Sequence, residues 1–364
     1  MPKPRARNLG LPFEGTPGPL NAITDVPGVE VGHATVIQGE GPLVVGQGPV
    51  RTGVTAVLPG GKSSYRRSFP AGFFSLNGNG EMTGVHWIEE AGLLTGPVLS
   101  TNTHSVGAVH QATIEWGLAN GFGEAFSLPV VAETYDGFLN DINGFHVRRE
   151  HVWAALDGAS SGPVAEGNVG GGTGMRVSGF KGGIGTASRR LERPYPGGEF
   201  GLEGHTLGVL VQANYGARGD LTICGVPVGP EFPDLLPEAP DLKDGSIIIV
   251  VATDAPLLPH QLKRVARRAA MGLARTGSVA YNGSGDLFLA FSTVEPLAAD
   301  GLRLWRAVPE GQMDALFKAA VQATEEAVVN ALMAAETMIG LNGRVVHALP
   351  HDRLLALMRR YNRA

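Results

Sequence analysis

The stretch that decides the fold is "DLKDGSIIIVVATDAPL", residues 241–257. From Ser246 to Ala252 it consists of Ser, Ile, Val and Ala without a charge. A continuous apolar run of this length predicts a strand buried on both faces, because a strand with one solvent face alternates apolar and polar residues. The run begins abruptly at Gly245-Ser246. The serine is either a simple strand start or a nucleophile held at the end of a rigid strand.

Composition limits the classes of protein to which the chain can belong. It has 364 residues, of which 43% are hydrophobic, enough for one large domain or two ordinary ones. Charged residues make up 17%, the formal net charge is −5, and no Lys/Arg-rich run is present, so nucleic acid is not an expected partner. No apolar run reaches the ~18 residues of a membrane span, and the N-terminal segment lacks the apolar core of a signal peptide. We therefore expect a cytoplasmic protein without membrane contact.

Glycine and cysteine usage is also informative. The 53 glycines are about twice the usual share, yet no G-X-Y period occurs and hydrophobic runs persist. The glycines are therefore expected at turns and at close backbone approaches within a packed fold. A single cysteine, Cys224, excludes an intrachain disulfide and is interpreted as a small buried hydrophobe rather than a nucleophile.

Strand and helix patterns alternate along the chain. The segment 225–245 contains five prolines and is predicted to be a loop or linker. The elements on either side of it are too few for two separate cores, which favours a single layered α/β sandwich. Apolar runs bounded by Gly and Pro predict strands within 28–37, 53–61, 96–106, 124–134, 204–213 and 287–293, and helical spacing predicts helices over 104–120, 258–274 and 311–337.

Ser246 has a chemical reason to be a nucleophile. A serine hydroxyl needs a base, an orienting group and an oxyanion hole. Cleavage of the Gly245–Ser246 bond would give Ser246 a free α-amine with a pKa near 7.7 to 8.0, which suits a general base at neutral pH. The proline-rich segment before the bond and the rigid strand after it would let the new end open into a pocket. The alternative is a serine that merely begins a strand.

Other motifs are weaker. Gly158 to Gly162, "GASSG", satisfies G-x-S-x-G, but a glycine-rich stretch follows where a nucleophile elbow needs a helix. "PGGKSS" has Ala56 in place of the first P-loop glycine, and "EGNVGGGTGM" does not complete a dinucleotide-binding pattern. His146 and His151 are five residues apart, which suits neither one helical face nor a zinc site. We therefore expect no metal and no cofactor.

Eight segments, in order, resemble one known family, the DmpA-like and β-aminopeptidase group, which comprises the L-aminopeptidase/D-esterase peptidases that mature by self-cleavage. The resemblance covers essentially the whole chain. Its segments are "NAITDVPGVEVGHATV" (21–36), "VTAVLP" (54–59), "NGNGEMTG" (77–84), "VAETYDGFLNDI" (131–142), "EGNVGGGTGM" (166–175), "GVLVQANYG" (208–216), "DGSIIIVVATDAPL" (244–257) and "GSGDLFLAF" (283–291).

The resemblance implies catalytic roles for Ser246, Ser284 and Asp286. Ser246 would be the nucleophile, exposed by cleavage after Gly245. Ser284 and Asp286 resemble the pair that hydrogen-bonds near the nucleophile and tunes its proton transfers, although some members of the group carry Glu at the second position. Considered without the resemblance, the triplet from Ser284 to Asp286 could equally be a hairpin tip.

Three further residues are implied in oxyanion and substrate binding. Asn214 resembles the side-chain donor to the oxyanion, and Glu133 and Tyr135 resemble residues that line the substrate pocket. A partly desolvated carboxylate such as Glu133 is a natural partner for the cationic amine of an aminopeptidase substrate. Considered in isolation, Asn214 could be a turn residue after a strand. Glu133 and Tyr135 could likewise be a simple strand end.

The resemblance also implies an architecture and a reaction. It predicts a four-layer αββα sandwich like that of N-terminal nucleophile hydrolases with different connectivity, formed by one domain over residues 1–364. Self-cleavage would divide it into an α chain 1–245 and a β chain 246–364, assembled as a homotetramer of αβ units. Substrates would be small peptides, amides or esters. The alternatives are an acyl transferase like the ornithine acetyltransferases, which use a threonine nucleophile, and a catalytically silent binding protein of the same fold.

Overall fold

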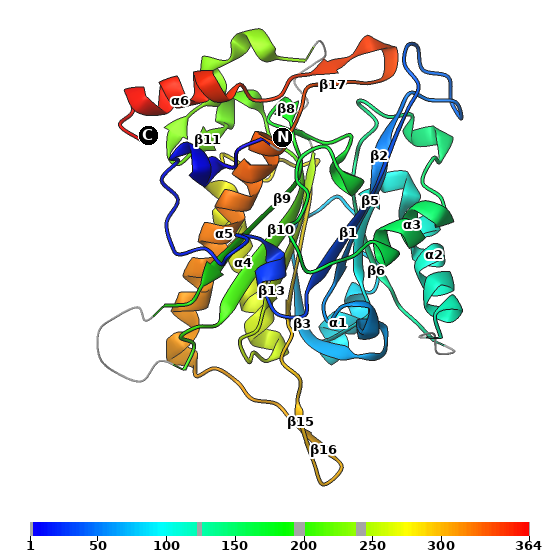
Figure 1. Ribbon diagram of the computed structural model, residues 1–364, viewed down its shortest axis with the longest axis vertical. Coiled ribbons are helices and arrows are strands. Elements are labelled where there is room, and N and C mark those ends of the chain that lie inside the picture. The colour runs from blue at the N-terminus through cyan, green and yellow to red at the C-terminus, as the bar shows by residue number, and fades with distance from the viewer. Residues whose placement is uncertain (1–2, 122–125, 193–200, 238–244, 364) are drawn as a thin grey trace.

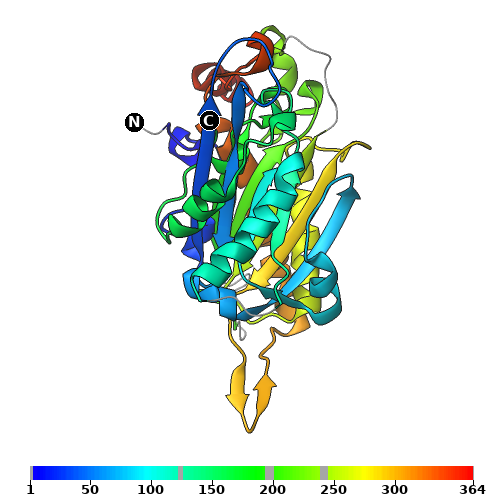
Figure 2. The same cartoon turned by 90° about the vertical axis from the view of Figure 1, so that its right-hand side faces the viewer.

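Two β-sheets stack face to face, and helices cover the outer face of each (Figures 1 and 2). The computed structural model describes residues 3–121, 126–192, 201–237 and 245–363. Helices α2 (Val106–Ala119) and α3 (Arg149–Asp157) lie on the smaller sheet, and α4 (Pro259–Ala274) and α5 (Met313–Ala334) lie on the larger one. The predicted four-layer αββα sandwich is confirmed.

The two sheets draw strands from distant parts of the chain. In spatial order, the smaller sheet contains β1 (Glu30–Gln38), β2 (Val50–Leu58), β5 (Val98–Asn102) and β6 (Val130–Thr134). In the same way, the larger sheet contains β4 (Leu93–Thr95), β3 (Ser68–Gly78), β14 (Gly285–Ser292), β13 (Ser246–Thr253), β10 (Thr206–Asn214) and β9 (Gly183–Arg190).

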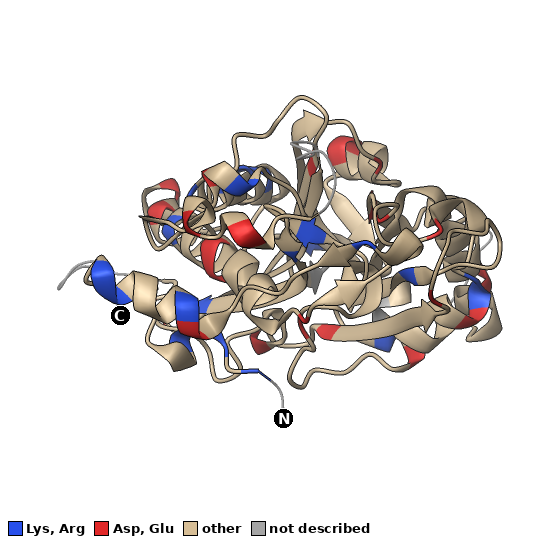
Figure 3. Ribbon diagram, turned by 90° about the horizontal axis from the view of Figure 1, so that it is seen from above, with Lys and Arg blue, Asp and Glu red and all other residues tan. Residues whose placement is uncertain are grey.

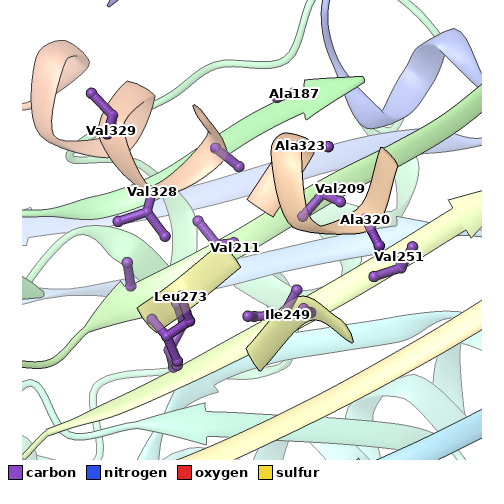
Figure 4. Packing of buried hydrophobic residues seen from close by; sticks show 14 of the residues in the cluster. Ala187, Val209, Val211, Ile249, Val251, Leu273, Ala320, Ala323, Val328 and Val329 are labelled. Carbon is purple, nitrogen blue, oxygen red and sulfur yellow. The ribbon is translucent and has the colours of Figure 1, made fainter. Parts of the chain in front are cut away.

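Strand β13 is the quoted apolar run and is buried along its whole length. Because strand side chains alternate, Ile247, Ile249 and Val251 point to α4 and α5, whereas Ile248 and Val250 point to the smaller sheet. Figure 4 shows the first of these layers, where Ile249 and Val251 pack with Val209 and Val211 of β10 beneath α5. Burial on both faces explains why the sequence of β13 shows no polar alternation.

The smaller sheet is covered in the same way. Val54, Ala56 and Leu58 of β2 pack with α2 and α3, and Val57 between them faces the larger sheet. In Figure 2 the α2 and α3 layer faces the viewer. Helix α2 contributes Val109, Ala112 and Trp116 to this outer core, as the apolar spacing of the segment predicts.

The predicted boundaries agree with the structure to within a few residues. Helices α4 and α5 occupy the segments predicted over 258–274 and 311–337. In the predicted loop 225–245, the described residues form only the two-residue strand β12 (Val226–Pro227) and two short 3-10 helices. Residues 238–244 of that loop lie outside the described residues. Strand β10 precedes this segment and β13 follows it, yet the two pair directly.

The remaining elements are peripheral. Helix α6 (His351–Arg360) contacts the predicted loop 225–245 through ion pairs from Arg353 to Asp234 and from Arg360 to Glu231. Basic and acidic positions are intermixed when the molecule is seen from above (Figure 3). The peripheral helices are α1 (Val85–Ala91) and α6. The peripheral strand pairs are β7 (Arg176–Val177) with β8 (Phe180–Lys181), β11 (Thr222–Ile223) with β12, β15 (Leu297–Ala299) with β16 (Leu302–Leu304), and β17 (Met338–Ile339) with β18 (Val345–Val346).

Across the residues that the structure describes, no helix combines the length and the apolar character needed to cross a membrane.

Packing around β13 predicts a large loss of stability when its helix-side face is truncated. Ile249→Ala should lower the free energy of unfolding by about 2–5 kcal/mol, because the substitution leaves a cavity between β13 and the helices. Ile37→Ala, at a half-exposed position of β1, should change it by no more than about 0.5 kcal/mol. Urea unfolding of both variants, each in a Ser246→Ala background that keeps chain continuity equal, measures the difference. Equal losses at the two positions would contradict this account of the core.

Candidate active site

Ser246 lies where three neighbouring strands of the larger sheet meet. It is the first residue of β13 and pairs with Gly285 of parallel β14 and with Asn214 of antiparallel β10. The N–H of Gly285 donates to the carbonyl oxygen of Gly245 at 3.1 Å and to Ser246 Oγ at 3.2 Å. One backbone donor therefore contacts both the hydroxyl and the carbonyl of the bond that the sequence marks for cleavage.

Gly245 is a glycine for a steric reason. A Cβ at this position would lie 2.2 Å from the carbonyl oxygen of Asn214 and 2.7 Å from Tyr215 Cα. Asn214 is held by the pairing of β10 with β13, and the carbonyl of Tyr215, the next residue, accepts from the Ser178 N–H at 2.7 Å. A side chain would therefore displace Gly245 and, with it, the carbonyl oxygen that accepts from the Gly285 N–H.

Ser284 and Asp286 form a hydrogen-bonded pair beside this point. Ser284 Oγ donates to Asp286 Oδ1 at 2.6 Å, and both residues are buried. They flank the first residue of β14, so the hairpin-tip interpretation is wrong. Asp286 alternates with Leu287 and points to the helix-covered face, whereas Ser246 faces the smaller sheet. Burial raises the pKa of Asp286 to about 6, against the hydrogen bonds from Ser284 and from the Ile247 backbone.

Asn214 faces the smaller sheet, on the same side as Ser246. Directly opposed residues of an antiparallel pair place their side chains close together on one face. Asn214 Oδ1 accepts from the backbone N–H of Arg176 at 2.8 Å, and Nδ2 donates to the carbonyl oxygen of Tyr135 at 2.9 Å. These two contacts define which end of the amide carries the oxygen. The side chain is built into the structure and is not a free turn residue.

Glu133 is the buried carboxyl of β6. Its Oε1 accepts from the Glu81 N–H at 3.0 Å, and its Oε2 accepts from the Thr103 hydroxyl. Burial raises its pKa above the usual value for Glu. A Cβ on Gly80 would lie 3.1 Å from Glu133 Oε1 and 3.2 Å from Gly285 Cα. Gly80 therefore lies between the carboxylate and Gly285, the residue that contacts Ser246.

Tyr135 follows β6 and is half-exposed. Its carbonyl oxygen contacts Asn214, so the backbone of the expected substrate-pocket residue supports the expected oxyanion donor. The structure thus connects Ser246 through Gly285 toward Glu133, and through the β10 pairing to Asn214 and Tyr135. The role of Tyr135 in lining a pocket stays a prediction.

Several residues that support this site escaped sequence reasoning. They are Asn79, whose N–H donates to the Ser284 carbonyl and whose Nδ2 donates to the Gly283 carbonyl, the backbone N–H groups of Gly285 and Arg176, and Thr103. Most of them act through backbone atoms, for which residue identity gives no signal. The segment "NGNGEMTG" (77–84), which contains Asn79, belongs to the family resemblance, but its sequence alone indicates no role for these residues.

His146 and His151 hydrogen-bond to other groups, and Cys224 packs against the hydrophobic core. His146 Nε2 lies 2.8 Å from Asp141 Oδ2, and His151 Nδ1 accepts from the Arg148 N–H at the start of α3. Cys224 is partly buried against the core, and burial raises the pKa of its thiol to about 12. In the described ranges no group of three or more His, Cys, Asp or Glu side chains is arranged to hold a metal ion.

The raised pKa of Asp286 predicts a pH-dependent contribution to stability. Between about pH 4 and pH 6 the folded chain keeps a proton on Asp286 that the unfolded chain releases, so rising pH lowers its stability across that window. Relative to Asp286→Asn, which cannot ionise, the loss should reach about 2–3 kcal/mol above pH 6. Urea unfolding at several pH values in the Ser246→Ala background measures it, with the surface variant Asp300→Asn as control. Identical pH slopes with and without the Asp286 carboxyl would contradict the prediction.

Comparison with known proteins gives consistent matches over nearly the whole chain. The model of Peptidase family S58 matches residues 21–346. Two relatives, each named beta-peptidyl aminopeptidase BapA, from Sphingosinicella microcystinivorans and Sphingosinicella xenopeptidilytica, are both 52% identical to this chain. These alignments cover 99% and 98% of this chain and 93% and 91% of the relatives.

Solved structures agree with the sequence matches. The L-aminopeptidase D-Ala-esterase/amidase of Ochrobactrum anthropi, described as a new variant among the Ntn hydrolase fold, is 50% identical with a TM-score of 0.91 over 99% of both chains. A β-aminopeptidase from Burkholderia sp. is 47% identical with a TM-score of 0.87, covering 98% of this chain and 99% of that one. With a serine at the start of the central strand and the same layered fold, the chain belongs to peptidase family S58 and is an aminopeptidase-type hydrolase with an N-terminal nucleophile fold.

Proposed function

We propose that the chain cuts itself between Gly245 and Ser246 and then works as an N-terminal serine aminopeptidase. The observation that carries this proposal is the Gly285 N–H, which contacts the Gly245 carbonyl oxygen and Ser246 Oγ together. The products would be an α chain 1–245 and a β chain 246–364 that remain associated in one αββα domain. Direct pairing of β10 with β13 would hold the two chains together after the cut.

The self-cleavage step follows from this geometry. Ser246 Oγ attacks the carbonyl carbon of Gly245, and negative charge develops on the oxygen that accepts from Gly285. The C–N bond breaks, the hydroxyl proton ends on the departing α-amine, and an ester joins Gly245 to Ser246 Oγ. Water hydrolyses the ester and frees both the carboxylate of Gly245 and the hydroxyl of Ser246.

The mature enzyme would use the new amine as a base. The α-amine of Ser246 takes the proton of Oγ while the oxygen attacks the carbonyl of the substrate, and it returns the proton to the leaving group. Asn214 faces the same side of the sheet as Ser246 and would donate its remaining Nδ2 hydrogen to the oxyanion. Ser284 and Asp286 lie beside the Ser246 backbone and would direct proton transfer at the amine. Hydrolysis of the acyl-enzyme completes the cycle.

Glu133 gives the proposed substrate its chemical class. The described hydrogen-bond partners of Glu133, a backbone N–H and a hydroxyl, are uncharged, so this buried carboxylate can take the charged amine of a substrate. We therefore propose that the enzyme removes N-terminal α-L-, β- or D-amino acyl groups from small peptides, amides or esters. The relatives named for β-peptidyl and for L-aminopeptidase and D-Ala-esterase activities support this range. Tyr135, exposed at the end of β6, would line the pocket.

We also propose that the αβ units assemble as a homotetramer and that the protein is cytoplasmic. Strands β15 and β16 form a hairpin that projects from the body in both views and exposes Leu297, Leu302 and Leu304 (Figures 1 and 2). A two-stranded hairpin with exposed leucines gains stability when another surface covers it, which supports association between copies.

Self-cleavage predicts two fragments in the wild type and one in Ser246→Ala. Sharing 38.0 kDa in proportion to 245 and 119 residues gives species of roughly 26 and 12 kDa. The variant lacks the attacking hydroxyl and should remain a single 38.0 kDa chain. Intact mass under denaturing conditions distinguishes the two results. An uncut wild type would overturn the proposal and favour a silent binding protein.

Gly245→Ala tests the same step from the other side of the bond. The added Cβ meets the Asn214 carbonyl and disturbs the position of the Gly245 carbonyl relative to the Gly285 N–H, so self-cleavage should slow by at least about tenfold. Gly311→Ala, at a glycine with open space around it and no positive φ, serves as the matched substitution. Cleavage at the wild-type rate in Gly245→Ala would remove the Gly285 contact from the mechanism.

Glu133→Gln should weaken recognition of the substrate amine. The isosteric amide loses a charge-assisted hydrogen bond of about 1.5–3 kcal/mol, so kcat/KM for a free-amine substrate should fall by roughly 10-fold to 100-fold. Glu81→Gln changes a neighbouring exposed carboxylate and keeps its backbone contact to Glu133, so its kcat/KM should stay within about threefold. Steady-state kinetics with an amino-acyl p-nitroanilide measures both. Equal losses in the two variants would assign the effect to general charge.

A further inference from the structure

Lys181 of β8 is fully buried. Among the described residues, the acceptors of its Nζ are backbone carbonyl oxygens. Its Nζ donates to Met175 and Gly182 at 2.9 Å each and to Gly172 at 3.2 Å. Burial lowers the pKa of this amine to about 7. The three acceptors match the three N–H groups of an ammonium, whereas a neutral amine has two N–H groups and can donate to only two of these carbonyls.

One of these contacts leads directly to the active site. The peptide group between Met175 and Arg176 has its oxygen bound by Lys181 Nζ at 2.9 Å and by the Gly182 N–H at 3.1 Å. The N–H of the same peptide group donates to Asn214 Oδ1 at 2.8 Å. Since a peptide group is planar, fixing its oxygen also fixes the direction of its N–H. Lys181 and the Gly182 N–H therefore act together to set the direction of that donor.

The far end of Asn214 completes the chain of contacts. Its Nδ2 donates to the Tyr135 carbonyl oxygen, so the amide lies between a backbone donor and a backbone acceptor. A flipped amide would set its NH2 against the Arg176 N–H and its oxygen against the Tyr135 carbonyl, and both contacts are repulsive. The observed orientation leaves one Nδ2 hydrogen for the space on the Ser246 side of the sheet.

We propose that Lys181 is a positioning residue for the oxyanion donor Asn214, acting through the Met175–Arg176 peptide group. The proposal rests on the proposed function of Asn214 and extends it to a residue that does not touch the substrate. Hydrogen bonds linked through polarised amides also strengthen one another in a low-dielectric interior. The glycine-rich loop within 166–175, which supplies two of the three carbonyls, thus supports the active site.

A purely structural role makes a different prediction. If Lys181 only satisfies buried carbonyls, its loss lowers stability, and the folded fraction keeps its turnover. If it positions Asn214, its loss lowers kcat in folded enzyme with little change in KM, because an oxyanion contact forms only in the transition state. The effect must also depend on Asn214 being present.

The test is a double-mutant cycle of Lys181→Met and Asn214→Ala in the full chain. Activity toward an amino-acyl p-nitroanilide is expressed per mole of 246–364 fragment, counted by intact mass. We expect Lys181→Met alone to lower kcat by roughly 10-fold to 100-fold with KM within about threefold. In the Asn214→Ala background the same substitution should change kcat by less than about threefold.

Arg218→Met is the matched control. Arg218 is also buried and donates to three backbone carbonyls, those of Ser178, Phe232 and Leu235, none of which belongs to the peptide group that contacts Asn214. Its loss should lower the melting temperature and leave kcat per folded, cut molecule within about threefold. If Lys181→Met does not fold, Lys181→Gln, which retains a donor, replaces it in the cycle.

The outcomes separate this proposal from the one on which it rests. A wild type that is neither cut nor active overturns the proposed function, and the Lys181 proposal with it. Cut, active wild type with an unchanged kcat in folded Lys181 variants overturns the Lys181 proposal alone. Equal kcat losses with and without Asn214, or the same loss in Arg218→Met, also overturn it. A loss confined to chains that retain Asn214 supports it.

Discussion

The position of β13 between two packed layers is the constraint on which the rest of the structure depends. Its side chains alternate between the helix-covered core and the core shared by the two sheets, so neither face is free. A slip of one residue would exchange every side chain between those faces and would turn Ser246 away from the smaller sheet. The pairing registers of β13 with β10 and with β14 therefore fix the position of Ser246.

Because the start of β13 is held in place, a backbone N–H contacts both Ser246 Oγ and the carbonyl oxygen of Gly245. The Gly285 N–H reaches the Gly245 carbonyl and Ser246 Oγ because β14 begins where β13 begins. Close approach of β10 leaves no room for a side chain on Gly245. The glycine content of the chain thus has a specific use at this site, since it lets backbone groups of separate strands meet around one bond.

Three buried ionisable side chains around the site are hydrogen-bonded to backbone groups and hydroxyls. Glu133 is bound by the Glu81 N–H and the Thr103 hydroxyl, Asp286 by the Ser284 hydroxyl, and Lys181 by three carbonyls. Burial raises the pKa of both carboxyls and lowers the pKa of the amine. The described hydrogen-bond partners of Glu133, a backbone N–H and a hydroxyl, are uncharged, so its carboxylate can take the cationic amine of the proposed substrate.

The sequence by itself determined the layered α/β class, the doubly buried strand and its serine, because periodicity and composition report burial directly. Helices α4 and α5 and the irregular segment after residue 225 were predictable for the same reason. The sequence left the triplet from Ser284 to Asp286 open between a hairpin tip and a site. Only the tertiary structure placed it at the start of a strand parallel to β13. The structure also supplied the contacts of the Gly285 and Arg176 N–H groups and the path from Lys181 to Asn214. These depend on backbone atoms of strands far apart in the chain, and every residue carries the same backbone N–H and C=O, so only their arrangement in space distinguishes them.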